Sequence, residues 1–240
     1  TLETEGMTDS KCETFGMRKL TNQNALLQIN NRRLFLRGTL ECCIFPLKGY
    51  PPMDEANWEK VFSAARDYGM NHLRFHSWCP PEAAFNVADR MGFYIQVELP
   101  LWTLNVGEDK STVDFLYNEA AHIMKEYGNH PSFCFWSLGN ELQGDFSVMD
   151  KLLTTIKQQD SRHLYMTTTF TFEPGHGSWP EPNDDFWVTQ WTKNGWVRGQ
   201  GIFDDQPVSF NKDFSSAIEG LPVPLITHEI GQYSVFPNLK

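Results

Sequence analysis

The sequence predicts an α/β fold in which parallel strands alternate with helices, as in a (β/α)8 barrel. Short apolar runs alternate along the chain with segments whose apolar residues recur every three or four positions. The run from Phe133 to Leu138 is apolar or small with little alternation, which is typical of a strand buried on both faces. Several such runs end in polar residues, as expected where parallel strands deliver side chains to a site at their carboxyl ends.

The composition is that of a globular chain with a large core. The 240 residues are 40% apolar, and the formal net charge is −10 without clusters of Lys or Arg. That balance argues against nucleic acid or an anionic membrane as a partner and favours a neutral substrate. Neither a signal peptide nor an apolar run of transmembrane length is found.

The first part of the chain is predicted to be an entry segment rather than part of the barrel. Residues 1–24 are mostly polar, and the barrel is placed at residues 25–240. Two short strands, Leu26–Asn30 and Arg33–Gly38, are expected around a turn at Asn30-Asn31.

The remaining elements follow from the pattern of apolar residues. The helix at 54–69 has Asp54 as its cap and Gly69 as its stop, and the helix at 112–128 is predicted to place Phe115, Ala121 and Met124 on its buried stripe. The strands are expected at 33–38, 71–78, 93–100, 133–138, 164–170, 185–191 and 223–231, and the other helices at 80–92, 146–160 and 211–219.

Two glutamates stand at the ends of apolar strands. Glu141 follows the run that ends at Leu138, and Glu229 ends the run that begins at Val223. If both strands belong to one barrel, their carboxyl ends meet, and the two carboxylates lie close together. A pair of carboxyl groups in different environments can divide acid and nucleophile roles, because their pKa values separate.

The second strand carries His72, Arg74 and His76 on one face. A zinc site at the two histidines lacks a third ligand at suitable spacing. Arg74 near two carboxylates would hold at least one of them ionised. Glu98 ends the third strand, and two interpretations stay open for it: a residue of the site, or a member of a buried ion pair.

The string Trp136-Ser137-Leu138-Gly139-Asn140-Glu141 closely resembles the acid/base motif of glycoside hydrolase family 2, the family of β-galactosidases and β-glucuronidases. Phe15-Gly16-Met17-Arg18 is similar to the string that closes a β-sandwich domain in that family, and Asn129-His130-Pro131-Ser132 is also a family string. The resemblance implies a TIM barrel preceded by a short remnant of a β-sandwich domain. It also implies a carbohydrate substrate.

The resemblance implies the roles of individual residues. Glu141 is the expected acid/base, and Glu229, in the string Glu229-Ile230-Gly231, is the expected nucleophile. Asn140 is expected to hold the sugar 2-hydroxyl. The residues assigned with it to substrate binding are Arg74, His76, Glu98, Trp191 and His228.

This sequence departs from the family pattern at several positions. After Arg74 the family has two residues and then His-Tyr, whereas here His76 comes one position early and Trp78 replaces the tyrosine. Trp191 stands where the family has a tyrosine that contacts the nucleophile, and an indole N–H donates but cannot accept. Because Pro100 replaces a histidine that follows Glu98 in metal-binding members, no metal and no other cofactor are expected.

The function expected from the resemblance is that of a retaining, exo-acting β-glycosidase. A non-catalytic carbohydrate-binding barrel stays open because of the departures at Trp78 and Trp191, as does a related β-mannosidase or endo-glycanase. Because only seven strands are visible, the chain is expected to be a fragment that is weakly active alone. The eighth strand and the β-sandwich domains then belong to the rest of the parent chain. The sequence assigns no compartment, and the resemblance favours a periplasmic or secreted bacterial enzyme.

Overall fold

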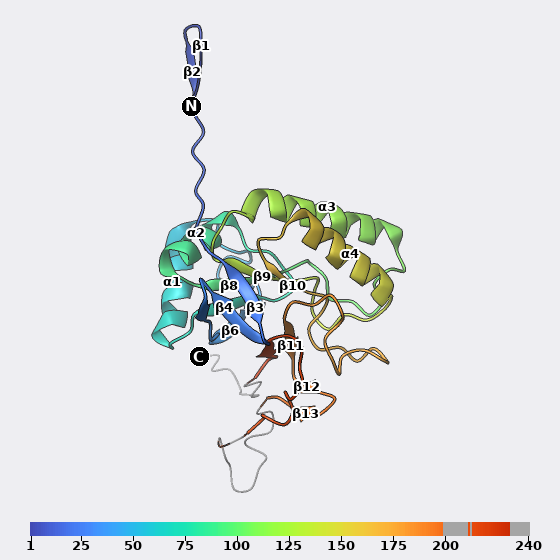
Figure 1. Cartoon of the computed structure of the whole chain (residues 1–240). Coiled ribbons are helices and arrows are strands. Elements are labelled where there is room, and N and C mark those ends of the chain that lie inside the picture. Colours follow the sequence, from blue (N-terminus) through green and yellow to red (C-terminus); the bar gives the residue numbers. More distant parts are fainter. Residues whose placement is uncertain (199–210, 212, 231–240) are drawn as a thin grey trace.

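The computed structural model describes residues 1–198, 211 and 213–230, and its centre is a five-stranded parallel sheet (Figure 1). The strand order is β10-β9-β8-β7-β6, so each strand pairs with its neighbour in the sequence, as in the wall of a barrel. These strands are β6 (Gly38–Glu41), β7 (His72–Phe75), β8 (Tyr94–Glu98), β9 (Phe133–Ser137) and β10 (Leu164–Met166).

Two further parallel strands extend this wall. β11 (Trp187–Thr189) pairs with β14 (Leu225–Thr227). Backbone hydrogen bonds from Asp185 to Tyr165 and from Phe170 to Val188 join β11 to the end of β10. The predicted incomplete barrel of seven parallel strands is therefore confirmed. β6 and β14 form the two ends of this arc and line a common cavity of about 500 Å³.

In the described part of the chain, four helices connect the strands. They are α1 (Glu55–Asp67), α2 (Glu82–Met91), α3 (Lys110–Tyr127) and α4 (Phe146–Gln159). α1 packs beside α2, and α3 beside α4 (Figure 1). The Asp54 side chain accepts a hydrogen bond from the backbone of Asn57 and so caps α1 as predicted, and Gly92 ends α2 in a left-handed conformation.

The core lies on both faces of β9. All five residues of β9 are buried: Trp136 belongs to the larger apolar cluster with Trp58, whereas Phe135 belongs to a second cluster with Leu27. The prediction of a strand covered on both sides is confirmed. No helix in the described part of the chain has the length and apolar character needed to cross a membrane.

Two helix predictions were wrong. α3 buries Leu116, Ala120 and Ile123, whereas the predicted Phe115 and Ala121 are exposed. Of the predicted stripe, Met124 is partly buried against the core. The predicted helix at 211–219 is a series of turns over residues 215–220. There the backbone N–H groups bond three residues back rather than four, as from Ala217 to Phe214.

Short antiparallel strands flank the barrel wall. Asn30 and Asn31 both have positive φ, which confirms the predicted turn. The predicted strand 33–38 was wrong beyond Arg33, because Leu34 and Leu36 turn into the second apolar cluster and pairing with β7 begins only at Gly38. The flanking strands are β1 (Leu2–Thr4), β2 (Met7–Asp9), β3 (Leu20–Gln23), β4 (Leu26–Ile29), β5 (Arg32–Arg33), β12 (Trp191–Thr192) and β13 (Gly195–Trp196).

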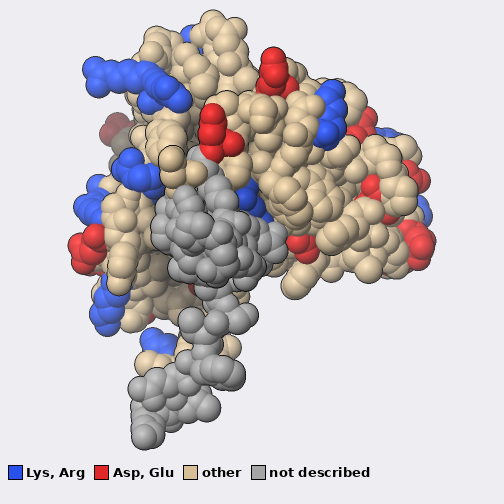
Figure 2. Space-filling model, turned by 90° about the horizontal axis from the view of Figure 1, so that it is seen from below, with Lys and Arg blue, Asp and Glu red and all other residues tan. Residues whose placement is uncertain are grey.

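The expected boundary between residues 24 and 25 falls in the turn of the hairpin that joins β3 to β4. The hairpin of β1 and β2 projects away from the body of the molecule (Figure 1). On the face shown in Figure 2, Lys and Arg lie at separate points among Asp and Glu rather than in one basic patch. That face offers no continuous basic surface to a polyanion.

Candidate active site

A tight turn after β9 carries Glu141. At Gly139, an added Cβ would lie 2.3 Å from the backbone oxygen of Leu101, so only glycine allows this close approach. Glu141 itself has φ of 50°, a left-handed conformation that non-glycine residues adopt only where the surroundings hold it. The backbone N–H of Glu141 donates to Thr169 Oγ1 at 2.9 Å. The turn brings the half-buried carboxyl group to the carboxyl end of the sheet.

Glu229 occupies an equivalent turn after β14. Its φ is 49°, and the preceding His228 donates its backbone N–H to Thr189 at the end of β11. Arg198 donates from Nη1 to the backbone oxygens of both His228 and Glu229, at 3.1 and 3.0 Å. The positively charged Arg198 side chain is therefore hydrogen-bonded to the backbone of this turn.

The two glutamates meet. One carboxyl oxygen of each, together with a ring nitrogen of His228, lie within 4.8 Å of one another. The strands that carry them come from different parts of the chain, and only the curvature of the wall brings their ends together. The expected convergence of Glu141 and Glu229 is thus a feature of the structure.

The surroundings separate the pKa values of the two carboxyl groups. Burial, followed by the charge of Glu229, raises the pKa of Glu141. The hydrogen bond from His228 lowers the pKa of Glu229, and the charge of Arg74 adds to it. Because burial lowers the pKa of His228, we treat its ring as a neutral donor through Nε2. One carboxyl group is biased towards the acid and the other towards the carboxylate.

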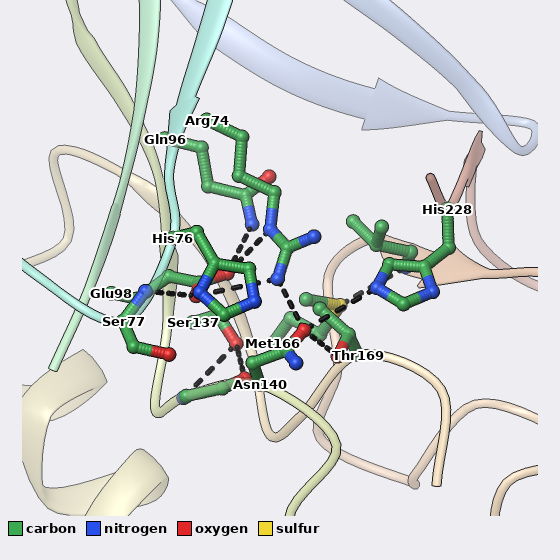
Figure 3. A network of polar contacts seen from close by, with 12 residues as sticks. Arg74, His76, Ser77, Gln96, Glu98, Ser137, Asn140, Met166, Thr169 and His228 are labelled. Carbon is green, nitrogen blue, oxygen red and sulfur yellow. Dashed lines mark hydrogen bonds and ion pairs between the residues drawn. The ribbon is translucent and has the colours of Figure 1, made fainter. Parts of the chain in front are cut away.

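Asn140 joins Arg74, Thr169 and His228 in one polar network (Figure 3). Its side-chain oxygen accepts from Arg74 Nη2 at 2.5 Å and from Thr169 Oγ1 at 2.9 Å, and it lies 3.3 Å from His228 Nε2. Its side-chain nitrogen is buried and has no partner among the described atoms. That nitrogen is a donor in want of an acceptor.

Arg74 and Glu98 form a buried ion pair (Figure 3). Arg74 Nε lies 2.7 Å from Glu98 Oε1, and the Glu98 carboxylate also accepts from Gln96 and from the backbone of Ser77. Glu98 has no exposed surface, so its assignment to direct substrate binding was wrong. Of the two interpretations left open, the structure shows the ion pair, which holds Arg74 against Asn140.

His76 borders the site, whereas the indole of Trp191 bonds elsewhere. His76 Nε2 lies 3.9 Å from Glu229 Oε1, and its ring meets the exposed Trp102 edge to face. Trp191 does not take the place of the family tyrosine at Glu229, because its indole N–H donates to Gly177 at 3.1 Å. Its ring packs on Phe170 instead.

Comparison with known proteins gives the family. The model described as glycosyl hydrolases family 2, TIM barrel domain, matches residues 20–171, more than half of the chain. The chain belongs to glycosyl hydrolase family 2. The matched residues include Glu141 but not Glu229.

Curated relatives within family 2 are considerably longer. β-Galactosidase 2 of Enterobacter cloacae is 26% identical over 151 residues, which are 60% of this chain and 14% of that protein. The β-galactosidase large subunit of Latilactobacillus sakei is 27% identical over 166 residues, 63% of this chain and 26% of that protein. The chain thus spans between 14% and 26% of these relatives.

Solved structures show the same fold. The β-glucuronidase of Parabacteroides merdae superposes with a TM-score of 0.68 at 22% identity, covering 85% of this chain and 26% of that one. The β-glucuronidase of Ruminococcus gnavus gives a TM-score of 0.71 at 18% identity, covering 91% of this chain and 39% of that one. At this identity the likeness concerns the fold alone.

Two residues of this family 2 site were missed by sequence reasoning. Arg198 follows the short β13, and no motif or apolar periodicity distinguishes it. Thr169 lies in a predicted strand, Leu164–Phe170, of which only Leu164–Met166 forms β10. The run of threonines after the strand was the available signal for Thr169. Nothing in the sequence pointed to Arg198.

Within the described residues, Glu141, His228 and Glu229 are a group whose ligand atoms converge closely enough for a metal ion. Here His228 Nε2 faces the oxygens of Glu229 and Asn140, which require it to carry its proton. Arg74 and Arg198 add positive charge on either side. That the site works without a metal stays a prediction.

Proposed function

We propose that this chain carries the active site of a retaining, exo-acting β-glycosidase, with Glu229 as the nucleophile and Glu141 as the acid/base. The observation that carries the proposal is the close approach of these two carboxyl groups with opposite pKa shifts. Retaining enzymes hold their carboxyl groups about 5 to 5.5 Å apart, whereas inverting enzymes leave roughly 6.5 to 9.5 Å for a water molecule. The separation within 4.8 Å supports the retaining reaction.

In the first step, the Glu229 carboxylate attacks the anomeric carbon while Glu141 gives its proton to the departing glycosidic oxygen. The bond to the leaving group breaks as the glycosyl–enzyme ester forms. In the second step, Glu141 takes a proton from water, and that water displaces Glu229 from the same carbon. Burial favours the protonated state of Glu141 that the first step needs, and His228 favours the ionised state of Glu229.

Asn140 supplies the contact to the sugar. Its side-chain nitrogen is the unpartnered buried donor of the site, and a 2-hydroxyl oxygen is a suitable acceptor. Such a contact strengthens as the ring becomes oxocarbenium-like, so it favours the transition state. Arg74 holds the Asn140 oxygen from the other side.

The names of the relatives set the first substrates to test. The curated relatives are named β-galactosidases and the solved structures β-glucuronidases, so aryl β-galactosides and β-glucuronides come first and aryl β-mannosides next. A 2-deoxy-2-fluoro glycoside of the sugar that turns over should label the protein. Peptide mapping should then find the sugar on Glu229.

A label on another residue would refute the nucleophile assignment. Sugar binding without turnover would favour a non-catalytic carbohydrate-binding barrel. Release of internal fragments from a polysaccharide would favour an endo-glycanase.

A further inference from the structure

A row of threonines follows β10 and faces the turn that carries Glu141. All are buried, and their hydroxyl groups are bonded. Thr168 Oγ1 accepts from the backbone N–H of Leu142, and Thr171 Oγ1 donates to the backbone oxygen of the same residue. Thr169 bonds to Asn140 and Glu141, the two residues that precede Leu142. Three of these threonines therefore bind the turn at three consecutive residues, 140, 141 and 142.

The directions of the hydrogen bonds at Thr169 follow from the groups around it. The backbone N–H of Glu141 can only donate, so the Thr169 oxygen accepts from it at 2.9 Å. The Thr169 hydroxyl proton is then free to bond Asn140 Oδ1, also at 2.9 Å. One hydroxyl group thus links the backbone of Glu141 to the side chain of Asn140, and Figure 3 shows the bond to Asn140.

The orientation of the Asn140 amide is fixed in the same way. The guanidinium of Arg74 has only donors, so the atom that it meets at 2.5 Å is the amide oxygen. With Thr169 and His228 also directed at that oxygen, the amide nitrogen is left on the opposite side without a partner. A turned amide would place its own donors against those of Arg74 and Thr169.

We propose that Thr169 is a positioning residue for the glycosidase site: its single hydroxyl group holds the left-handed Glu141 turn and keeps the Asn140 nitrogen aimed at the substrate 2-hydroxyl. This inference rests on the proposed function. The hydroxyl is placed for both tasks because Thr169 is fully buried and its two bonds run to adjacent residues. Glu141, at φ of 50°, has no regular secondary structure to hold it otherwise.

Three variants of the full chain separate positioning from simple loss of stability. Thr169→Val keeps the shape and removes the hydroxyl, whereas Thr169→Ser keeps the hydroxyl. Thr167→Val is the matched control, because Thr167 is buried two residues away and its hydroxyl bonds Asp184 instead of the Glu141 turn.

The activity test uses the aryl glycoside that turns over in the screen and its 2-deoxy counterpart. Thr169→Val should lower kcat/KM on the parent glycoside about 100-fold, the usual effect of a misplaced site group. The loss on the 2-deoxy glycoside should be smaller, because that substrate makes no contact with Asn140 and is affected only through the Glu141 turn. Thr169→Ser should recover most of the activity. Equal losses on both substrates, or no loss, would overturn the inference.

A second measurement needs no turnover. In protein labelled with ¹⁵N-glutamate, the backbone amide of Glu141 should exchange with solvent about 10-fold faster or more in Thr169→Val, because its acceptor is gone. The rate should stay near that of the wild type in Thr169→Ser and Thr167→Val. If no glycoside is cleaved, the proposed function fails, and this exchange rate alone decides the positioning role. An unchanged rate in Thr169→Val would overturn it.

Discussion

The two glutamates lie at the ends of strands that are held in different ways. β9, which leads to Glu141, is buried along its whole length and pairs on both sides within the five-stranded sheet. β14, which leads to Glu229, pairs with β11, and its three residues are partly buried or exposed. Glu141 thus inherits its position from the core. The position of Glu229 depends more on the side chains of His228 and Arg198.

This difference matches the chemistry proposed for each residue. Burial raises the pKa of a carboxyl group, which suits an acid delivered by a buried strand. A nucleophile must stay ionised, and here a hydrogen bond from His228 outweighs the burial of Glu229. A less enclosed strand end, surrounded by donors and cations, is the more suitable place for it.

The largest expected effect comes from removing each glutamate in turn. Glu229→Ala should lower kcat on the order of 10⁶-fold, because no other group replaces a lost nucleophile. Glu141→Ala should cost about 10² to 10⁴-fold on substrates with poor leaving groups and far less on aryl glycosides with good ones. Added azide should partly restore turnover in Glu141→Ala. Azide rescue that favours Glu229→Ala under the same conditions would reverse the assignment.

The next largest effect tests whether the buried ion pair in the five-stranded sheet contributes to the free energy of unfolding. Arg74→Met leaves the fully buried Glu98 carboxylate without its counter-ion, which should lower the free energy of unfolding by about 3 to 5 kcal/mol. Lys157→Met is the control, because its partner Asp185 is partly exposed, and it should cost less than about 1 kcal/mol. Urea unfolding followed by circular dichroism gives both values.

The double variant Arg74→Met with Glu98→Gln should recover part of the lost stability, since it no longer buries an unpaired charge. If Arg74→Met unfolds at the same urea concentration as the wild type, the ion pair does not contribute to the free energy of unfolding.

The same difference explains how far the sequence predicted the site. Glu98 ends an apolar strand, Arg74 lies within one and Glu141 follows one. A strand pattern places such residues regardless of distant contacts. The sequence left the role of Glu98 open, because an ion pair and a substrate contact use the same carboxylate and only burial separates them. Arg198 was missed because its place depends on backbone oxygens of residues about 30 positions away, which no local pattern encodes.

The same contrast between the core and its periphery holds for the prediction of helices and strands. Strands and helices that bury apolar faces in the main core were predicted correctly. Residues 211–219 were predicted to be a helix, but the backbone hydrogen bonds there form turns instead. The orientation of α3 was wrong because half-buried residues such as Met124 and Tyr127 carry the same apolar pattern as the true inner face. Gly231, which completes the predicted nucleophile string, lies outside the described residues.

The smallest expected effect is a shift in the pH dependence of kcat/KM. It distinguishes most sharply between Glu141 and Glu229. The acidic limb of kcat/KM reports protonation of Glu229, and the alkaline limb reports loss of the proton from Glu141. His228→Phe removes the hydrogen bond that is the largest cause of the lowered pKa of Glu229, so that pKa rises and the acidic limb should move to higher pH. His228→Gln, which keeps a donor on its side chain, should move it less.

Arg198→Gln should act on both limbs, because the charge of Arg198 interacts with Glu229 as well as with Glu141. The positive charge of Arg198 partly offsets the raised pKa of Glu141, so its removal lets that pKa rise further and the alkaline limb should move to higher pH. Measurement of kcat/KM over the pH range in which each variant stays folded compares the two. If His228→Phe shifts the alkaline limb and leaves the acidic limb in place, then His228 does not tune Glu229.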